Sequence, residues 1–157
     1  MNEISRIKKV YKNYKMGDKD FNYRWHPRNF VSITYRHLLE RKLVTLLNRH
    51  KILLENKSLI DVGCGDGGML EFLLYLSLNN VTVVGQELLE ERAESSREKL
   101  GSRATIIEGS AESIDFPDNH FDLVFCFTVF SSILDDNMRK VVAKEMSRIV
   151  KPGGHII

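Results

Sequence analysis

Apolar residues recur along this chain with two different periods. Beyond residue 58, short apolar runs alternate with stretches in which apolar residues return every three or four positions. The runs predict strands and the stretches predict helices, a succession typical of parallel strands joined by crossover helices. Strands are predicted at 58–62, 81–85, 104–107 and 121–127, helices at 69–78, 90–100 and 136–150, and the start of a fifth strand at 155–157.

Turn and capping residues mark the ends of these elements. Gly101 predicts the end of the helix over 90–100, and Asp135 or Asp136 predicts the N-cap of the last helix. Pro152-Gly153-Gly154 predicts where that helix stops. Its expected buried face consists of Met138, Val141, Val142, Met146 and Ile149. The predicted fold class is α/β, with a doubly wound and mostly parallel sheet.

The first 50 residues follow the helical period alone. A short helix is predicted at the start, a break at 16–20 and a second helix over 31–50. We therefore expect an N-terminal helical segment over 1–50 and an α/β domain over 51–157 that folds as a single unit.

Composition narrows the class of protein. The chain has 157 residues, 43% of them hydrophobic, and no apolar run approaches the roughly 20 residues that a membrane span needs. The N-terminus lacks the apolar stretch of a signal peptide, so we expect a cytoplasmic protein without a membrane partner. Cys64 and Cys126 have neither zinc-type spacing nor a disulfide-framework count, and no metal site is predicted.

Charge is distributed unevenly along the chain. Residues 1–50 carry twelve Lys or Arg against four Asp or Glu, and also seven of the fourteen aromatic residues. Solvated helix faces with docked aromatic rings explain this composition. The alternative explanations are binding of nucleic acid, of an anionic membrane surface, or of a phosphorylated or carboxylated small-molecule acceptor. No nucleic-acid-binding motif is present, so no nucleic-acid partner is predicted.

Four glycines lie between the predicted strand at 58–62 and the following helix. Gly63, Gly65, Gly67 and Gly68 let the backbone turn tightly and approach a nucleotide-like ligand at the helix N-terminus. Their spacing also fits the dinucleotide pattern G-x-G-x-x-G, so the loop alone does not separate NAD from S-adenosylmethionine. Asp61 favours the second ligand, because a carboxylate opposes a pyrophosphate and attracts an ammonium group. A purely structural role for Asp61, accepting bonds from loop amides, stays open.

Glu87 follows the second predicted strand, 24 residues beyond Gly63. This is close to the offset of about 20 residues expected of an acid that binds ribose hydroxyls. An ordinary acidic residue at the start of a helix is the alternative. Leu88 beside it is a candidate for packing on an adenine ring.

Residues 58–157 resemble the class I, Rossmann-like S-adenosylmethionine-dependent methyltransferases of the small-molecule type. Asp61-Val62-Gly63-Cys64-Gly65-Asp66-Gly67 looks like the first motif of that family, and Val84-Gly85-Gln86-Glu87-Leu88 looks like the second. The stretch from Glu108 to Val124 is similar to the adenine-side loop and fourth strand, and Ile149–Gly154 resembles the turn into strand five. Four motifs in the family's order are more specific than any one of them.

The resemblance implies a sheet order of 3-2-1-4-5, a Rossmann-like S-adenosylmethionine-binding domain over 51–157, and a cover formed by 1–50. It also implies the cofactor-binding residues: Asp61, Gly63, Cys64, Gly65, Gly67, Glu87, Leu88, Ser110, Ala111, Glu112 and Phe127. Ser110 departs from the family, which commonly has Asp there. No catalytic residue is assigned, since a direct displacement works largely by alignment and exclusion of water.

The expected function is methyl transfer from S-adenosylmethionine to a small or medium-sized acceptor, with S-adenosylhomocysteine as product. A non-catalytic cofactor-binding or interaction module of the same fold is the alternative, and an NAD-dependent oxidoreductase is a weaker one. The family's sheet ends in a hairpin that this sequence lacks, so the fold is expected to stop at strand five. An uncovered sheet edge would favour self-association.

Overall fold

The computed structural model describes residues 2–17, 29–77 and 80–157, with only the backbone described at 13–17. The chain forms two compact units, Ser5–Leu53 and Met1–Ile4 with Leu54–Ile157.

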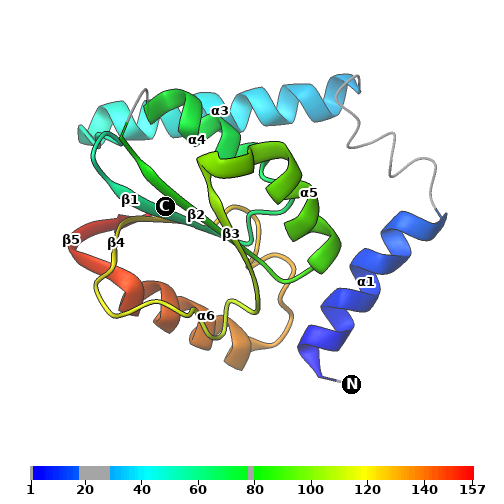
Figure 1. The fold of residues 1–157 in the computed structure, drawn as a ribbon. Coiled ribbons are helices and arrows are strands. Elements are labelled where there is room, and N and C mark those ends of the chain that lie inside the picture. Colours follow the sequence, from blue (N-terminus) through cyan, green and yellow to red (C-terminus); the bar gives the residue numbers. More distant parts are fainter. Residues whose placement is uncertain (1, 18–28, 78–79) are drawn as a thin grey trace. The chain divides into compact units, whose positions relative to one another are not determined.

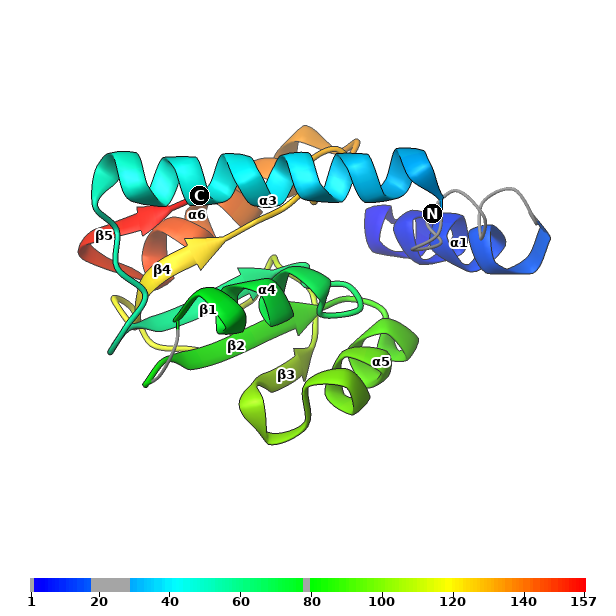
Figure 2. The same cartoon turned by 90° about the horizontal axis from the view of Figure 1, so that it is seen from above.

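The larger unit holds a sheet of five strands with helices on both faces (Figures 1 and 2). The chain runs through β1 (Ser58–Val62), α4 (Gly68–Ser77), β2 (Thr82–Glu87), α5 (Glu90–Leu100), the short 3₁₀ helix η1 (Gly101–Arg103), β3 (Thr105–Glu108), β4 (Phe121–Phe125), α6 (Asp136–Ile149) and β5 (Val150–Ile156). The strand order is β3-β2-β1-β4-β5 and all four pairings are parallel, which confirms the predicted fold class and order.

The core follows from the apolar strands at the centre of the sheet. In β1, Leu59, Ile60 and Val62 have no exposed surface, and neither do Phe121 and Val124 in β4. Helices α4 and α5 cover one face and α6 the other, so both faces of these strands are buried (Figures 1 and 2). The strand order reverses between β1 and β4, and ligands of open α/β sheets bind at the carboxyl ends of the strands next to such a reversal.

The last strand begins earlier than predicted. The chain becomes extended directly after Ile149, at Val150 rather than at 155. Val150 pairs with Phe121 and His155 with Leu123, so residues 151–154 bulge opposite a single residue of β4. Pro152-Gly153-Gly154 therefore lies within an irregular strand. Only glycine fits at 154, since a Cβ there would lie 2.7 Å from the carbonyl oxygen of Asp122.

Three smaller predictions also need correction. Strand β4 ends at Phe125 rather than 127, and Thr128 beyond it adopts a left-handed conformation with φ of 64°. Val141 is 41% exposed, whereas the other four residues of the predicted α6 face are buried. Helix α1 (Glu3–Gly17) continues through the expected break at Met16, and residues 18–20 of that break lie outside the described residues.

Asp122 joins three strands at the amino end of the sheet. Its carboxylate accepts hydrogen bonds of 2.9 Å from the Ser58 amide, the Ser58 hydroxyl and the Lys151 ammonium. Burial opposes ionisation, but these donors outweigh it and hold the pKa of Asp122 well below its usual range. The carboxylate thus stays charged and ties β4 to β1 and β5.

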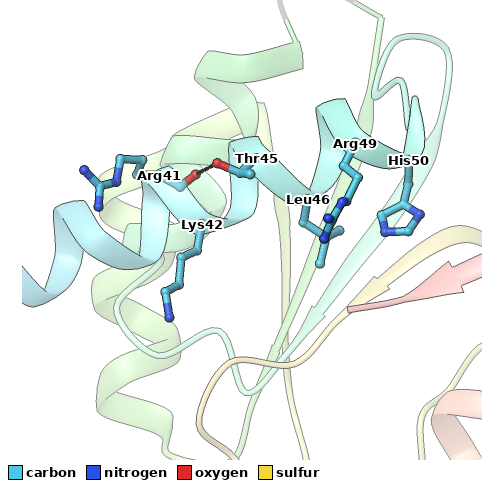
Figure 3. A pocket seen from close by; sticks show the side chains of 6 residues that line it. All are labelled: Arg41, Lys42, Thr45, Leu46, Arg49 and His50. Carbon is cyan, nitrogen blue, oxygen red and sulfur yellow. Dashed lines mark hydrogen bonds between the residues drawn. The ribbon is translucent and has the colours of Figure 1, made fainter.

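The smaller unit contains most of α1 and all of α3 (Phe30–His50). Helix α3 begins at Asn29, whose side chain accepts hydrogen bonds from the amides of Val31 and Ser32. An open cavity of about 340 Å³ lies along α3, lined by Arg41, Lys42, Thr45, Leu46, Arg49 and His50 (Figure 3). Within the described residues, no helix combines the length and apolar character needed to cross a bilayer.

Replacing Asp122 with alanine should destabilise the larger unit, because three donors lose a charged acceptor. We expect the free energy of unfolding to fall by about 2–3 kcal/mol, measured by urea denaturation at pH 7. The matched control is Glu98→Ala on the exposed side of α5, which should change stability by less than about 0.5 kcal/mol. Equal losses for the two variants would contradict the role given to Asp122.

Candidate functional site

The loop from Gly63 to Gly67 links β1 to α4 and lies at the carboxyl edge of the sheet. Its first two amides, from Gly63 and Cys64, donate to the carbonyl oxygen of Gln86 at 2.7 and 3.0 Å. Gly63 and Gly65 have φ of 78° and 57°, a conformation that favours glycine. A Cβ at Gly65 would also lie 3.2 Å from the Arg92 guanidinium. Arg92 in turn pairs with Asp66 at 2.9 Å, so this loop is held from both sides.

Glu87 anchors the same loop through its carboxylate. One oxygen accepts the Gly65 amide at 2.8 Å and the other accepts the Leu89 amide at 3.0 Å. The side chain is buried at the end of β2. Each carboxylate oxygen has further acceptor capacity, so these bonds leave room for a ligand hydroxyl.

Asp61 is buried between the neighbouring strands. It pairs in register with Gly85 of β2 and Phe125 of β4 and is 2% exposed. Its Oδ1 atom has no hydrogen-bond partner among the described residues. Burial, and secondly the negative charge of Glu87, raise the pKa of Asp61 from its ordinary value of 3.8 to about 7. A buried carboxylate with an unused oxygen fits a site for a cationic group.

The two cysteines are free thiols next to this charge. Cys64 is buried, and a Cβ added to Gly85 would lie 2.7 Å from its sulfur. Burial, followed by the charges of Asp61 and Glu87, raises the pKa of Cys64 to about 12. Burial and Asp61 also raise the pKa of the half-buried Cys126 to about 12.

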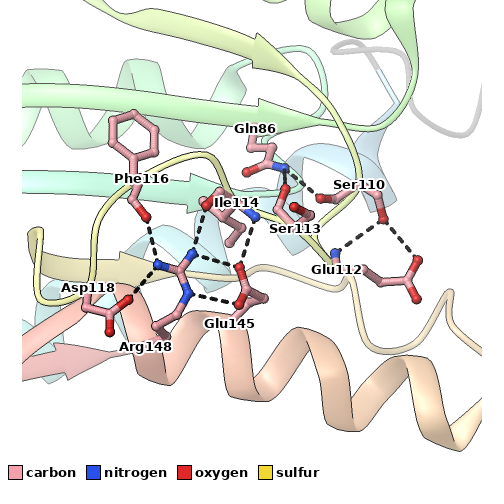
Figure 4. A network of polar contacts seen from close by, with 9 residues as sticks. All are labelled: Gln86, Ser110, Glu112, Ser113, Ile114, Phe116, Asp118, Glu145 and Arg148. Atoms are coloured by element: carbon pink, nitrogen blue, oxygen red, sulfur yellow. Dashed lines mark hydrogen bonds and ion pairs between the residues drawn. The ribbon is translucent and has the colours of Figure 1, made fainter.

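The loop after β3 is joined to β2 by the buried side chain of Gln86 (Figure 4). Its Nε2 donates to the carbonyl oxygens of Ser110 at 2.8 Å and Ser113 at 3.4 Å. The Ser110 hydroxyl donates to the Glu112 carboxylate at 3.3 Å and accepts the Glu112 amide at 3.2 Å. The backbone of this loop is therefore fixed next to Glu87, whose carbonyl oxygen accepts the Gly109 amide at 2.9 Å.

Arg148 and Glu145 of α6 hold the following part of this loop (Figure 4). The guanidinium donates to the carbonyl oxygens of Ile114 and Phe116 at 2.8 and 2.7 Å, and to the carboxylate of Glu145. Glu145 accepts the Ile114 amide at 3.0 Å. The bond from Arg148 is the main reason that the pKa of Glu145 falls to about 2. We define these two side chains as the α6 clamp.

The segment after β4 lies against the glycine loop. Phe127 is half-buried and stacks on Phe125 with ring centroids 5.8 Å apart. The left-handed Thr128 turns the chain so that the Val129 side chain reaches Gly63, where an added Cβ would overlap it. A β-branched residue in this conformation is unusual, and such backbone outliers cluster at functional sites.

The structure brings most of the predicted site residues to one edge of the sheet. Glu87 bonds the glycine loop directly, and Ser110 and Glu112 bond each other beside the end of β2. Leu88 and Ala111 are half-buried in the loops after β2 and β3. Among the described residues, no group of three or more His, Cys, Asp or Glu side chains is arranged to hold a metal.

The sequence prediction missed Gln86, Arg92 and the α6 clamp. Gln86 lies just beyond the predicted strand at 81–85, and its signal appears only once β2 is seen to continue to Glu87, because a buried polar side chain in a strand needs partners. Arg148 and Glu145 read as an ordinary exposed helix pair, because their loop partners lie about 30 residues away in sequence.

Residues 60–157 match the family described as "Methyltransferase domain". Among curated relatives, a sterol 24-C-methyltransferase of Aspergillus fumigatus is 34% identical over 105 residues, covering 64% of this chain and 26% of that protein. A demethylmenaquinone methyltransferase of Bacillus licheniformis is 27% identical over 96% of this chain and 59% of its own length. The chain thus spans between about a quarter and three-fifths of the length of these two relatives.

A solved structure has the same fold. The PH0226 protein from Pyrococcus horikoshii matches with a TM-score of 0.69 and 26% identity, over 89% of this chain and 65% of that one.

Asp61→Asn should stabilise the unliganded protein at high pH. Between pH 3.8 and about 7 the folded state keeps a proton that the unfolded chain releases, so the free energy of unfolding falls as pH rises through this range. Asparagine does not titrate, so the variant does not lose stability over this pH range. The free energy of unfolding of the variant minus that of the parent should be at least about 1 kcal/mol larger at pH 8 than at pH 5, measured by urea denaturation. An identical pH dependence in both proteins would refute the raised pKa.

Arg148→Gln should loosen the loop after β3 while the sheet stays folded. Two carbonyl oxygens and the carboxylates of Glu145 and Asp118 lose their donor. Glu145, which accepts the Ile114 amide, is then no longer held, so this amide should exchange with deuterium at least about tenfold faster, measured by mass spectrometry of peptides over 110–120. The control is Arg139→Gln, which removes an exposed ion pair with Asp136 at the start of the same helix. If both variants exchange alike, the α6 clamp does not hold this loop.

Proposed function

Because this chain belongs to the methyltransferase-domain family, we propose that it transfers a methyl group from S-adenosylmethionine to a small or medium-sized acceptor, with S-adenosylhomocysteine as product. The observation that carries the proposal is the buried Asp61 with an unused oxygen, next to a glycine loop that Glu87 holds in place. The cofactor combines an ammonium group with a nucleoside, and both parts find matching chemistry at this edge of the sheet.

The residues present fit that ligand. Asp61 would attract the ammonium group, while Gly63, Cys64, Gly65 and Gly67 would line the methionine portion with backbone. Glu87 would accept hydrogen bonds from the ribose hydroxyls in addition to those from its two amides.

The loop after β3 would border the adenine ring. Ser110, Ala111 and Glu112 would lie along one side of it, Leu88 would pack on it, and Phe127 would close the methionine end. In this chain, the Glu112 carboxylate lies within hydrogen-bond distance of the Ser110 hydroxyl. The pair therefore supplies a charged oxygen close to where relatives commonly have an aspartate.

The cofactor supplies a methyl group activated by a positively charged sulfur. The chain's part is to align the acceptor with that group and to exclude water, which is why no catalytic base is needed in the proposal. The curated relatives are named for sterol and quinone substrates, so sterols and quinone precursors are the first acceptors to test.

A nicotinamide-dependent oxidoreductase is less well supported. Asp61 lies at the loop where a pyrophosphate would have to bind, and bringing two like charges together in a buried site is costly. Nicotinamide dinucleotide is therefore the negative control for cofactor binding.

Calorimetric titration at pH 8 should show saturable binding of S-adenosylhomocysteine and none of NAD. Asp61→Asn should weaken the binding at least about tenfold, since it removes the charge opposite the ammonium group. For the parent protein, affinity should rise between pH 6 and pH 8 as Asp61 ionises, and the variant should lack this rise.

Glu98→Gln provides the matched control for a lost carboxylate outside the site and should bind like the parent. Saturable binding of NAD without binding of S-adenosylhomocysteine would overturn the proposal. Binding of S-adenosylhomocysteine without transfer of a labelled methyl group to any sterol or quinone precursor would favour the non-catalytic module.

A further inference from the structure

Helix α3 has a long exposed face on which apolar and cationic side chains occupy successive turns. By the helical period, one side carries Val31, Tyr35, Leu38, Lys42, Thr45, Leu46 and Arg49. Val31 is 70% exposed and Tyr35 is 50% exposed, so half or more of each side chain's surface is in contact with solvent. The apolar members lie mostly in the first half of the helix and the cations in the second.

This face carries no negative charge. Glu40 is the single acidic residue of α3, lies on the opposite side by the helical period, and pairs with Arg36 at 2.8 Å. The cavity along α3 is lined by four cationic or titratable side chains and no carboxylate: Arg41, Lys42, Arg49 and His50 (Figure 3). The face is therefore complementary to an anionic partner.

We propose that this face of α3 lies on the surface of an anionic lipid bilayer. Aliphatic and aromatic side chains insert at the boundary between the lipid headgroups and the acyl chains. The phosphates of the same bilayer surface attract Lys and Arg side chains. Val31, Tyr35 and Leu38 would enter that boundary, and Lys42 and Arg49 would meet the headgroups. Lying on a bilayer is distinct from crossing it, so the lack of a spanning helix among the described residues does not bear on this proposal.

Other binding partners would match only part of this face. A nucleic acid would engage the cations through its phosphates but gives exposed Val31 and Leu38 no partner. A second copy of the chain would oppose the same cations with no carboxylate to meet them. The proposal does not rest on the methyl transfer proposed above, because none of these residues is among the cofactor-binding residues named there.

Vesicle pelleting with the full chain tests the proposal. Vesicles of phosphatidylcholine with 30% phosphatidylglycerol should pellet the protein in 50 mM salt, while pure phosphatidylcholine should not. The double variant Lys42→Glu/Arg49→Glu should lower the partition coefficient at least about tenfold. Val31→Ser/Leu38→Ser should weaken it without changing its salt dependence.

Lys140→Glu/Lys144→Glu is the matched control, with the same charge change at exposed positions of α6. Circular dichroism and S-adenosylhomocysteine titration establish that each variant is folded and keep the result separate from the cofactor proposal. Failure to pellet with anionic vesicles, equal pelleting with neutral ones, or an equal loss in the α6 control would each overturn the lipid-surface assignment.

Discussion

The hydrogen bond between the Gly65 amide and the Glu87 carboxylate fixes the geometry on which the site depends. It joins the loop after β1 to the end of β2, and the two strands are already paired in register up to Val62 and Gln86. A charged acceptor inside a buried setting forms a stronger bond than one in water, provided that its donors are in place. The sheet therefore positions the acid, and the acid positions the glycine loop.

The two edges of the sheet use carboxylates in opposite ways. At the amino edge, Asp122 is surrounded by donors that keep it ionised and stabilise the fold. At the carboxyl edge, Asp61 is buried near the like charge of Glu87, and both factors oppose its ionisation. The first carboxylate stabilises the fold, and the second is the one that the proposed cofactor site depends on. The α6 clamp on the loop after β3 limits how far the second edge can relax.

Local pattern predicted the elements well because both the strands and the amphipathic helices leave a period in sequence. The central strands and an N-cap at Asp135 or Asp136 follow from short-range signals, and the structure has the cap at Asp135. The offset of Glu87 from the glycine loop indicated a shared site, but the bond from the Gly65 amide spans 22 residues and no local pattern predicts it. The start of β5 could not be predicted from such signals, because its bulge is defined by pairing with β4 rather than by residues 152–154 themselves. Gln86 and Arg148 act on backbone carbonyls at distances of 24 to 34 residues in sequence, and no local pattern encodes such partners.

The buried thiol of Cys64 has a chemical consequence for a protein that handles a methylating reagent. With a pKa near 12, the thiolate fraction at neutral pH is on the order of one in 10⁵. Thiolates are the form of cysteine that alkylating agents attack. Burial, and secondly the carboxylates that would attract a cationic cofactor, thus keep the adjacent sulfur protonated in the unliganded protein, the form that reacts slowly with alkylating agents.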